Sequence, residues 1–203
     1  MRITGGTLRS RTLRAPPGSA TRPTTDRVRE ALFGILASVG ALEGANVADL
    51  YAGTGALGIE AISRGARRAT LVESARPALA ALRANVESLG VNDRVRVVPG
   101  DVGASARRIA SDGPFDLVLA DPPWADVDSG DAARALASLA AAGAFASAAT
   151  LVLEHASRSQ PPEIVGLARE DTRRYGDTAL TFYKIAILAE PPGRSHDRGP
   201  LRE

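Results

Sequence analysis

The chain has 203 residues, of which 44% are apolar, and this is enough to form one well-packed globular domain. It contains no cysteine, which excludes disulfides, a thiolate nucleophile and a cysteine zinc site, and we expect it to work in a reducing compartment, the cytoplasm. Its net charge is only +2, and it shows neither a signal segment nor an apolar run of membrane-spanning length, so we expect neither secretion nor membrane insertion.

Basic residues are concentrated at the start of the chain. The first 30 residues hold seven arginines and two acidic residues. Short apolar residues alternate with arginines around Gly5-Gly6, which predicts a small β-hairpin or extended arm over residues 1–20. A basic arm on a nearly neutral body is typical of a protein that binds a polyanion such as nucleic acid.

A helix is predicted after Thr24 or Thr25, since either side chain can cap it. Apolar residues recur at helical spacing from Val28 onward and form a packing face. Arg27 and Arg29 fall off that face, so we expect them to be exposed, where they either contact a polyanion or are simply solvated.

From residue 46 onward, short apolar segments alternate with helical ones. The expected strands cover residues 46–51, 69–73, 95–98, 115–120 and 150–154, and the helices between them cover 56–64, 77–89, 105–111 and 132–142. This alternation predicts an α/β fold with a doubly wound, mostly parallel sheet. Residues 163–174 and 179–188 then form an antiparallel hairpin, which brings the sheet to seven strands. We expect the main domain over residues 21–189 and a flexible tail over residues 190–203.

The first strand runs into a glycine turn, Asp49-Leu50-Tyr51-Ala52-Gly53-Thr54-Gly55-Ala56-Leu57-Gly58. Gly53 and Gly55 let the backbone turn tightly against a ligand, and Gly58 lets the next helix pack closely on the strand. The free N–H groups at the start of that helix favour an anionic group. Because Glu73 follows about 20 residues later, the pattern fits a nucleoside-bearing cofactor, either NAD or S-adenosylmethionine.

Acidic residues fall at or just after the ends of the expected strands. They are Asp49, Glu73, Asp101 and Asp121. In an open α/β sheet the ligand lies beyond the carboxyl ends of the strands, so we expect these residues at a ligand site. The alternative for each of them is a structural cap.

The fourth strand ends in Asp121-Pro122-Pro123-Trp124. The prolines fix the backbone, so the Asp121 carboxylate and the Pro122 carbonyl become rigid hydrogen-bond acceptors, while Trp124 offers a flat face on which a base can stack. Such a pocket suits a planar group that carries NH2 and does nothing evident for hydride transfer. It therefore favours transfer to an amine over NAD chemistry.

These segments resemble known methyltransferases. Residues 49–58 are similar to motif I of the class I S-adenosylmethionine-dependent enzymes. Asp121-Pro122-Pro123-Trp124 is similar to the amine-methylating motif of these enzymes. With Arg22-Pro23-Thr24-Thr25-Asp26-Arg27-Val28-Arg29-Glu30 and the opening Arg2-Ile3-Thr4-Gly5-Gly6, nearly the whole chain resembles the RsmD-type 16S rRNA guanine-N2 methyltransferases. In the RsmD-type family, the last position of the amine-methylating motif is more often Phe or Tyr. The resemblance implies a Rossmann-like class I fold, S-adenosylmethionine as cofactor, and 16S rRNA in the small ribosomal subunit or its assembly intermediate as partner.

The resemblance also implies roles for individual residues. The catalytic residues would be Asp121, Pro122, Pro123 and Trp124, with Asp121 acting as proton acceptor or as orienter. The cofactor would be bound by Asp49, Ala52, Gly53, Thr54, Gly55, Glu73, Ser74, Asp101, Val102 and Asp121. The RNA would contact Arg2, Arg9, Arg11, Arg22, Thr25, Arg27 and Arg29. We expect a monomer and no metal, since His155 and His196 are isolated in the sequence.

Three other functions share part of this pattern. The Asp-Pro-Pro-aromatic motif also serves methyltransferases that act on DNA adenine or on a protein amine. An NAD-dependent oxidoreductase shares the glycine turn and Glu73. A non-catalytic RNA-binding module could retain the fold, although intact Asp49, Gly53, Gly55 and Asp121 argue against it.

Overall fold

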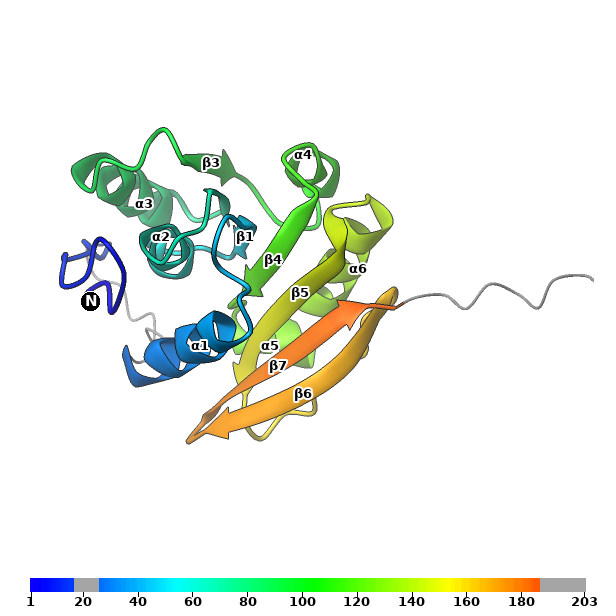
Figure 1. Cartoon of the computed structure of the whole chain (residues 1–203). Helices are drawn as coiled ribbons and strands as arrows, with labels where there is room; N and C mark the ends of the chain where they lie inside the picture. The colour runs from blue at the N-terminus through cyan, green and yellow to red at the C-terminus, as the bar shows by residue number, and fades with distance from the viewer. Residues whose placement is uncertain (17–25, 187–203) are drawn as a thin grey trace, which may run out of the picture.

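The structure is a computed structural model that describes residues 1–16 and 26–186. Within these residues, seven strands form one sheet in the order β3-β2-β1-β4-β5-β7-β6 (Figure 1). Strands β1 to β5 pair in parallel, and β7 pairs antiparallel with both β5 and β6. The predicted mostly parallel α/β sheet with a C-terminal antiparallel hairpin is therefore confirmed.

The strands are β1 (Asn46–Leu50), β2 (Arg68–Glu73), β3 (Val95–Pro99), β4 (Phe115–Ala120), β5 (Phe145–Ala156), β6 (Leu167–Tyr175) and β7 (Thr178–Ile185). The helices are α1 (Asp26–Ser38), α2 (Ala56–Ser63), α3 (Arg76–Ser88), α4 (Ala106–Ala110), α5 (Trp124–Asp128) and α6 (Asp131–Ala141).

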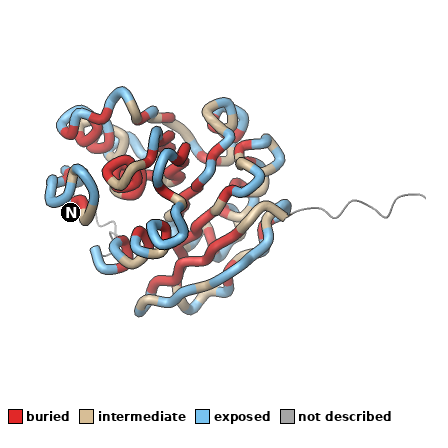
Figure 2. Tube along the Cα trace, in the orientation of Figure 1, coloured by how far each residue is buried: buried red, intermediate tan, exposed pale blue. Residues whose placement is uncertain are grey.

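Two apolar layers cover the two faces of the sheet. Val47 and Leu117 pack with α1, α2 and α3 on one face, whereas Ala48 and Val118 pack with α4 and α6 on the other. Successive residues of a strand point to opposite faces, so a strand covered on both sides needs apolar residues almost throughout. Strands β1 and β4 accordingly run through the most buried part of the molecule (Figure 2).

The structure moves three predicted boundaries. Strand β5 begins at Phe145 instead of residue 150, because Phe145 already pairs with Phe115 before the register shifts. The stretch after Pro123, which lies outside the predicted strands and helices, contains the short helix α5. Strand β1 ends at Leu50, and Tyr51, expected in the strand, is a turn residue with a positive φ of 63°.

The N-terminal arm is docked on the main domain. A single antiparallel bridge, Arg2 with Thr12, closes it in place of regular hairpin strands. Its residues Ile3 and Leu13 are buried in the same apolar layer as α1, α2 and α3. The arm thus shares a core with the body of the protein.

Several predicted features lie outside the described residues. They are the cap at Thr24 or Thr25, the RNA-binding residues Arg22 and Thr25, the isolated His196, and the tail over residues 190–203. In the part of the chain that is described, no helix combines the length and apolar character that crossing a bilayer requires.

Candidate active site

The carboxyl ends of four parallel strands lie in one row. Ala120 of β4 pairs beside Leu50 of β1, Leu50 beside Val72 of β2, and Val72 beside Val98 of β3. The predicted acidic residues stand at or just beyond this row, and both Asp121 and Glu73 are close enough to act electrostatically on Asp49. The structure therefore brings together the glycine turn, Glu73 and Asp121, which are far apart in the sequence.

The first two glycines of the turn differ in the space around them: Gly55 is closely packed and Gly53 is open. Gly53 and Gly55 have positive φ angles of 56° and 84°. A Cβ atom on Gly55 would lie 2.5 Å from Cδ1 of Leu82 in α3, whereas one on Gly53 would meet no atom within 4 Å. A Cβ on Gly58 would lie 3.1 Å from Cβ of Asp49, which confirms that this glycine permits close packing of α2 on β1.

Asp49 is a buried carboxylate with one unused oxygen. Its Oδ2 accepts a 2.7 Å hydrogen bond from the N–H group of Gly58, while Oδ1 has no hydrogen-bond partner among the described residues. Burial, opposed by that hydrogen bond and reinforced by Asp121 and Glu73, raises the pKa of Asp49 to about 7. A cationic group of a ligand would supply the missing partner and compensate the buried charge.

Glu73 closes the other side of the turn. Its Oε2 accepts from the N–H group of Gly53 at 2.8 Å, and its Oε1 accepts from the N–H groups of Ser74 and Ala75 at 2.7 Å each. Each carboxylate oxygen has two lone pairs, so Oε1 is fully used, whereas Oε2 retains capacity for one further donor such as a hydroxyl group. Glu73 is therefore fixed at the turn with one acceptor site still usable.

Asp101 and Val102 follow β3 at the next position along the row. The Asp101 side chain is exposed, and its Oδ1 accepts a 2.8 Å hydrogen bond from the N–H group of Ala104. Val102 is buried in the apolar layer under α4 and α6. The pair thus presents one fixed, exposed carboxylate at the end of β3, while the buried Val102 side chain ties this segment to the core.

The Asp-Pro-Pro-Trp segment leaves β4 beside the end of β1. The N–H group of Asp121 donates to the carbonyl of Leu50 at 3.4 Å, so Asp121 lies one strand from the glycine turn. Pro122 is buried, and Pro123 precedes Trp124, which begins α5. The guanidinium carbon of Arg158 lies 5.8 Å from the centroid of the Trp124 ring and holds the indole by a cation–π contact.

Sequence reasoning missed Tyr51 as a site residue. It adopts a left-handed backbone conformation, which is strained for a residue with a side chain, directly before the glycine turn. Burial, together with the acidic residues Asp101, Asp126 and Asp131, raises the pKa of Tyr51 to about 12. Its phenol therefore stays protonated and can donate a hydrogen bond near the strand ends. A tyrosine continuing an apolar strand carries no signal of this turn.

The predicted RNA-binding arginines separate into two groups. Arg2, Arg9, Arg11 and Arg27 are exposed, as a phosphate contact requires. Arg29 corrects the prediction, because its side chain is 0% exposed and pairs with the equally buried Glu60 at 3.1 Å. It also donates to the carbonyl of Arg2, so it anchors the arm and cannot reach RNA in this structure.

The His155 ring is enclosed by neighbouring residues of the sheet. The ring is buried, with Nδ1 2.9 Å from the carbonyl oxygen of Ala156 and Nε2 2.8 Å from the hydroxyl of Thr181. Burial is the main cause that lowers its pKa, so the ring is neutral at pH 7. Across residues 1–16 and 26–186, no group of three or more His, Asp or Glu side chains is arranged to hold a metal ion.

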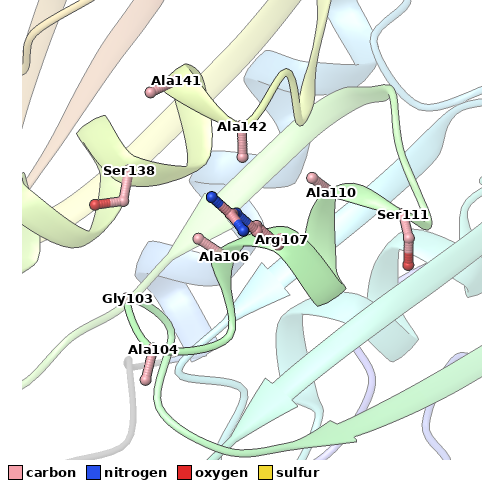
Figure 3. A pocket seen from close by; sticks show the side chains of 9 residues that line it. All are labelled: Gly103, Ala104, Ala106, Arg107, Ala110, Ser111, Ser138, Ala141 and Ala142. Atoms are coloured by element: carbon pink, nitrogen blue, oxygen red, sulfur yellow. The ribbon is translucent and has the colours of Figure 1, made fainter.

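A cavity of about 780 Å³ lies outside the predicted site. It runs between α4 and α6 and is lined mainly by small side chains, with Arg107 reaching into it (Figure 3). Gly103 and Ala104 line its start, just after Asp101 and Val102. None of its lining residues was predicted to bind a ligand.

Comparisons with known proteins agree with this geometry. The sequence profile of the family described as conserved hypothetical protein 95 matches residues 1–184. YlbH of Bacillus subtilis (strain 168), a candidate rRNA methyltransferase, is 31% identical over 192 residues, which are 91% of this chain and 98% of YlbH. Ribosomal RNA small subunit methyltransferase D of Escherichia coli (strain K12) is 42% identical over 124 residues, which are 61% of this chain and 60% of that protein.

A solved structure extends the likeness over the whole fold. The structure of yhhF from Escherichia coli, a candidate methyltransferase, matches with a TM-score of 0.76 and 34% identity over 91% of this chain and 97% of that chain. On both grounds the chain belongs to the family described as conserved hypothetical protein 95, the RsmD-type family of class I methyltransferases.

Proposed function

We propose that this protein transfers a methyl group from S-adenosylmethionine to the exocyclic N2 atom of a guanine in 16S rRNA. One observation carries the proposal: Asp121-Pro122-Pro123-Trp124 leaves β4 directly beside the glycine turn that follows β1. An amine held at the first segment therefore lies next to a cofactor held at the second. Close placement of two reactants accounts for a large part of the rate gain in such a transfer.

The residues around the glycine turn fit this cofactor. Asp49, Gly53 and Gly55 would surround its methionine part, where the unpartnered Oδ1 of Asp49 matches a cationic amino group. Glu73 would accept from the ribose hydroxyls, and Asp101 with the backbone of Val102 would contact the adenine. When bound, S-adenosylmethionine supplies an electrophilic methyl group on a sulfonium centre.

The Asp-Pro-Pro-Trp segment would hold the target base. The Asp121 carboxylate and the Pro122 carbonyl accept the two hydrogens of the amine and direct the nitrogen lone pair toward the turn. Trp124 stacks on the base, which must be unstacked from its neighbours before it can enter. Asp121 either takes the released proton or orients the amine until water does so.

The choice of 16S rRNA rests on charge and on relatives. Arg2, Arg9, Arg11 and Arg27 are exposed at the arm and α1, where they can contact phosphates. Relatives are named for rRNA methylation, one of them for the small subunit. A cytoplasmic enzyme acting on the small ribosomal subunit or its assembly intermediate accounts for both.

The test is a transfer assay with methyl-labelled S-adenosylmethionine and small subunits from cells that lack the matching modification. We expect N2-methylguanosine at one position of 16S rRNA, and at least a hundredfold slower transfer by Asp121→Asn, on the order expected for a lost oriented acceptor. Asp93→Asn, an exposed acidic residue between α3 and β3, is the matched control and should transfer at the normal rate.

Two further samples locate the substrate. Label on assembled subunits but not on protein-free rRNA would assign the enzyme to late assembly, and the reverse result to early assembly. Label on DNA adenine or on protein, with none on rRNA, would refute the proposed substrate. Cofactor binding without any transfer would favour a binding module.

A further inference from the structure

Asn85 joins the N-terminal arm to the glycine turn. Its side chain, on α3, is 0% exposed. Its Oδ1 accepts from the N–H group of Arg14 at 2.8 Å, and its Nδ2 donates to the carbonyl of Arg14 at 3.0 Å, so the amide pairs with the arm backbone at two points. The same Nδ2 donates to the carbonyl of Thr54 at 3.0 Å.

These three bonds use both amide hydrogens and one acceptor site of a fully buried side chain. A buried amide that loses its partners costs far more than the bond itself contributes, so this arrangement is held as a unit. Thr54 lies between Gly53 and Gly55, the two residues whose positive φ angles shape the turn. A shift of the Arg14 backbone is therefore transmitted through the Asn85 amide to the carbonyl of Thr54 in the turn.

Helix α3 gives the connection a rigid support. Leu82, one turn before Asn85, lies where a Cβ on Gly55 would clash, so α3 touches the turn at two neighbouring residues. The arm meets the same helix again where Arg11 donates to the carbonyl of Ser88 at 3.3 Å. On α2, by contrast, Ser63 binds the arm through Gly5 and Leu8.

We propose that Asn85 is a positioning residue that couples docking of the basic arm to binding of the cofactor at the glycine turn. The proposal rests on the proposed function, because it takes the ligand of the turn to be S-adenosylmethionine. Coupling between two sites is reciprocal, so ligand at the turn must tighten the arm as much as the docked arm tightens the ligand.

The reciprocal effect is measurable in the unmodified protein. S-adenosylhomocysteine is the probe, and trypsin reports arm opening by cleavage at the exposed Arg9 and Arg11. We expect saturating S-adenosylhomocysteine to slow this cleavage on the order of fivefold, the effect of about one net hydrogen bond. Equal rates with and without the probe would overturn the coupling, and this test needs no variant to fold.

Two variants identify the residue responsible. In Asn85→Ala we expect faster arm cleavage, S-adenosylhomocysteine bound on the order of fivefold more weakly, and no protection of the arm by the probe. In the matched variant Ser63→Ala, which loosens the arm and leaves the Asn85 hydrogen bonds in place, we expect faster cleavage that the probe still slows on the order of fivefold. Circular dichroism and thermal melting establish that each variant is folded.

The outcomes separate this proposal from the proposed function. If the unmodified protein does not bind S-adenosylhomocysteine, the cofactor assignment fails and the coupling fails with it. If it binds the probe but Asn85→Ala and Ser63→Ala behave alike, the cofactor assignment stands and the role of Asn85 is refuted.

Discussion

Asp49 provides a test of the site that needs no RNA. Its pKa of about 7 lies above the ordinary value of 3.8 because the carboxyl group is buried beside Asp121 and Glu73. The folded protein therefore holds a proton that the unfolded chain releases. The contribution of the Asp49 carboxyl group to the free energy of unfolding is fully present below pH 4 and is lost as the pH rises through 7.

The substitution Asp49→Asn replaces the carboxyl group with an amide that does not ionise, so the variant does not lose this stability as the pH rises. The amide oxygen can still accept from the N–H group of Gly58, so the hydrogen bond at 2.7 Å is retained. The gap between 3.8 and about 7 corresponds to at most about 4 kcal/mol. The free energy of unfolding of the variant should exceed that of the unmodified protein by an amount that grows by about 3 kcal/mol from pH 5 to pH 8.

Urea unfolding at several pH values measures the difference, with Asp93→Asn as the control for loss of an exposed acidic residue. A gap between Asp49→Asn and the unmodified protein that stays constant from pH 5 to pH 8 would refute the argument. The gain has a functional cost, because a cationic ligand group favours the ionised carboxyl. Binding of S-adenosylhomocysteine at pH 7 should release protons, as calorimetry in buffers of different ionisation enthalpy reports, and the variant should bind more weakly without that release.

Two further predictions concern single positions with matched neighbours. Gly55→Ala places a Cβ 2.5 Å from Leu82 at a φ of 84°, so we expect it to lose about 2 to 4 kcal/mol in urea unfolding, whereas Gly53→Ala, with open space, loses only about 1 to 2 kcal/mol for the backbone. Arg29→Ala removes one donor of the buried Glu60, which keeps Arg64 and Thr4, and should cost about 2 to 3 kcal/mol, while the exposed Arg27→Ala should stay within about 0.5 kcal/mol and instead weaken RNA binding in a filter assay. Equal losses within either pair would contradict these assignments.

The fold could be predicted because its signals are local. Apolar runs such as residues 115–120 alternate with helical segments, and turns such as Tyr175-Gly176-Asp177 separate them. The strand-end position of Glu73 and Asp121 follows from the same pattern, since parallel strands end at one edge. The sequence predicts too short a strand β5, because residues 144–149 are alanine and serine apart from Phe145, and these residues carry little strand signal.

The remaining features depend on contacts between distant residues. Arg29 lies off the apolar face of α1 by spacing, but Glu60, 31 residues away, draws it into the core. Asn85 looks like a polar residue on a helix until the arm, 71 residues earlier, covers it. Neither contact leaves a trace in local periodicity, so only the folded structure assigns these side chains.

These contacts change what the arm is. From its charge and its position in the sequence alone, the arm would be expected to be removable without any effect on cofactor binding. Yet Glu60 accepts hydrogen bonds from Thr4 of the arm as well as from Arg29 and Arg64, and Ile3 and Leu13 fill the layer beneath α2. Deleting the arm would leave a buried carboxylate with fewer donors and an apolar surface open to water, both of which are destabilising. The segment that carries the arginines proposed to bind RNA is therefore also part of the scaffold that holds the glycine turn, and the proposed sites for RNA and for cofactor share one structural support.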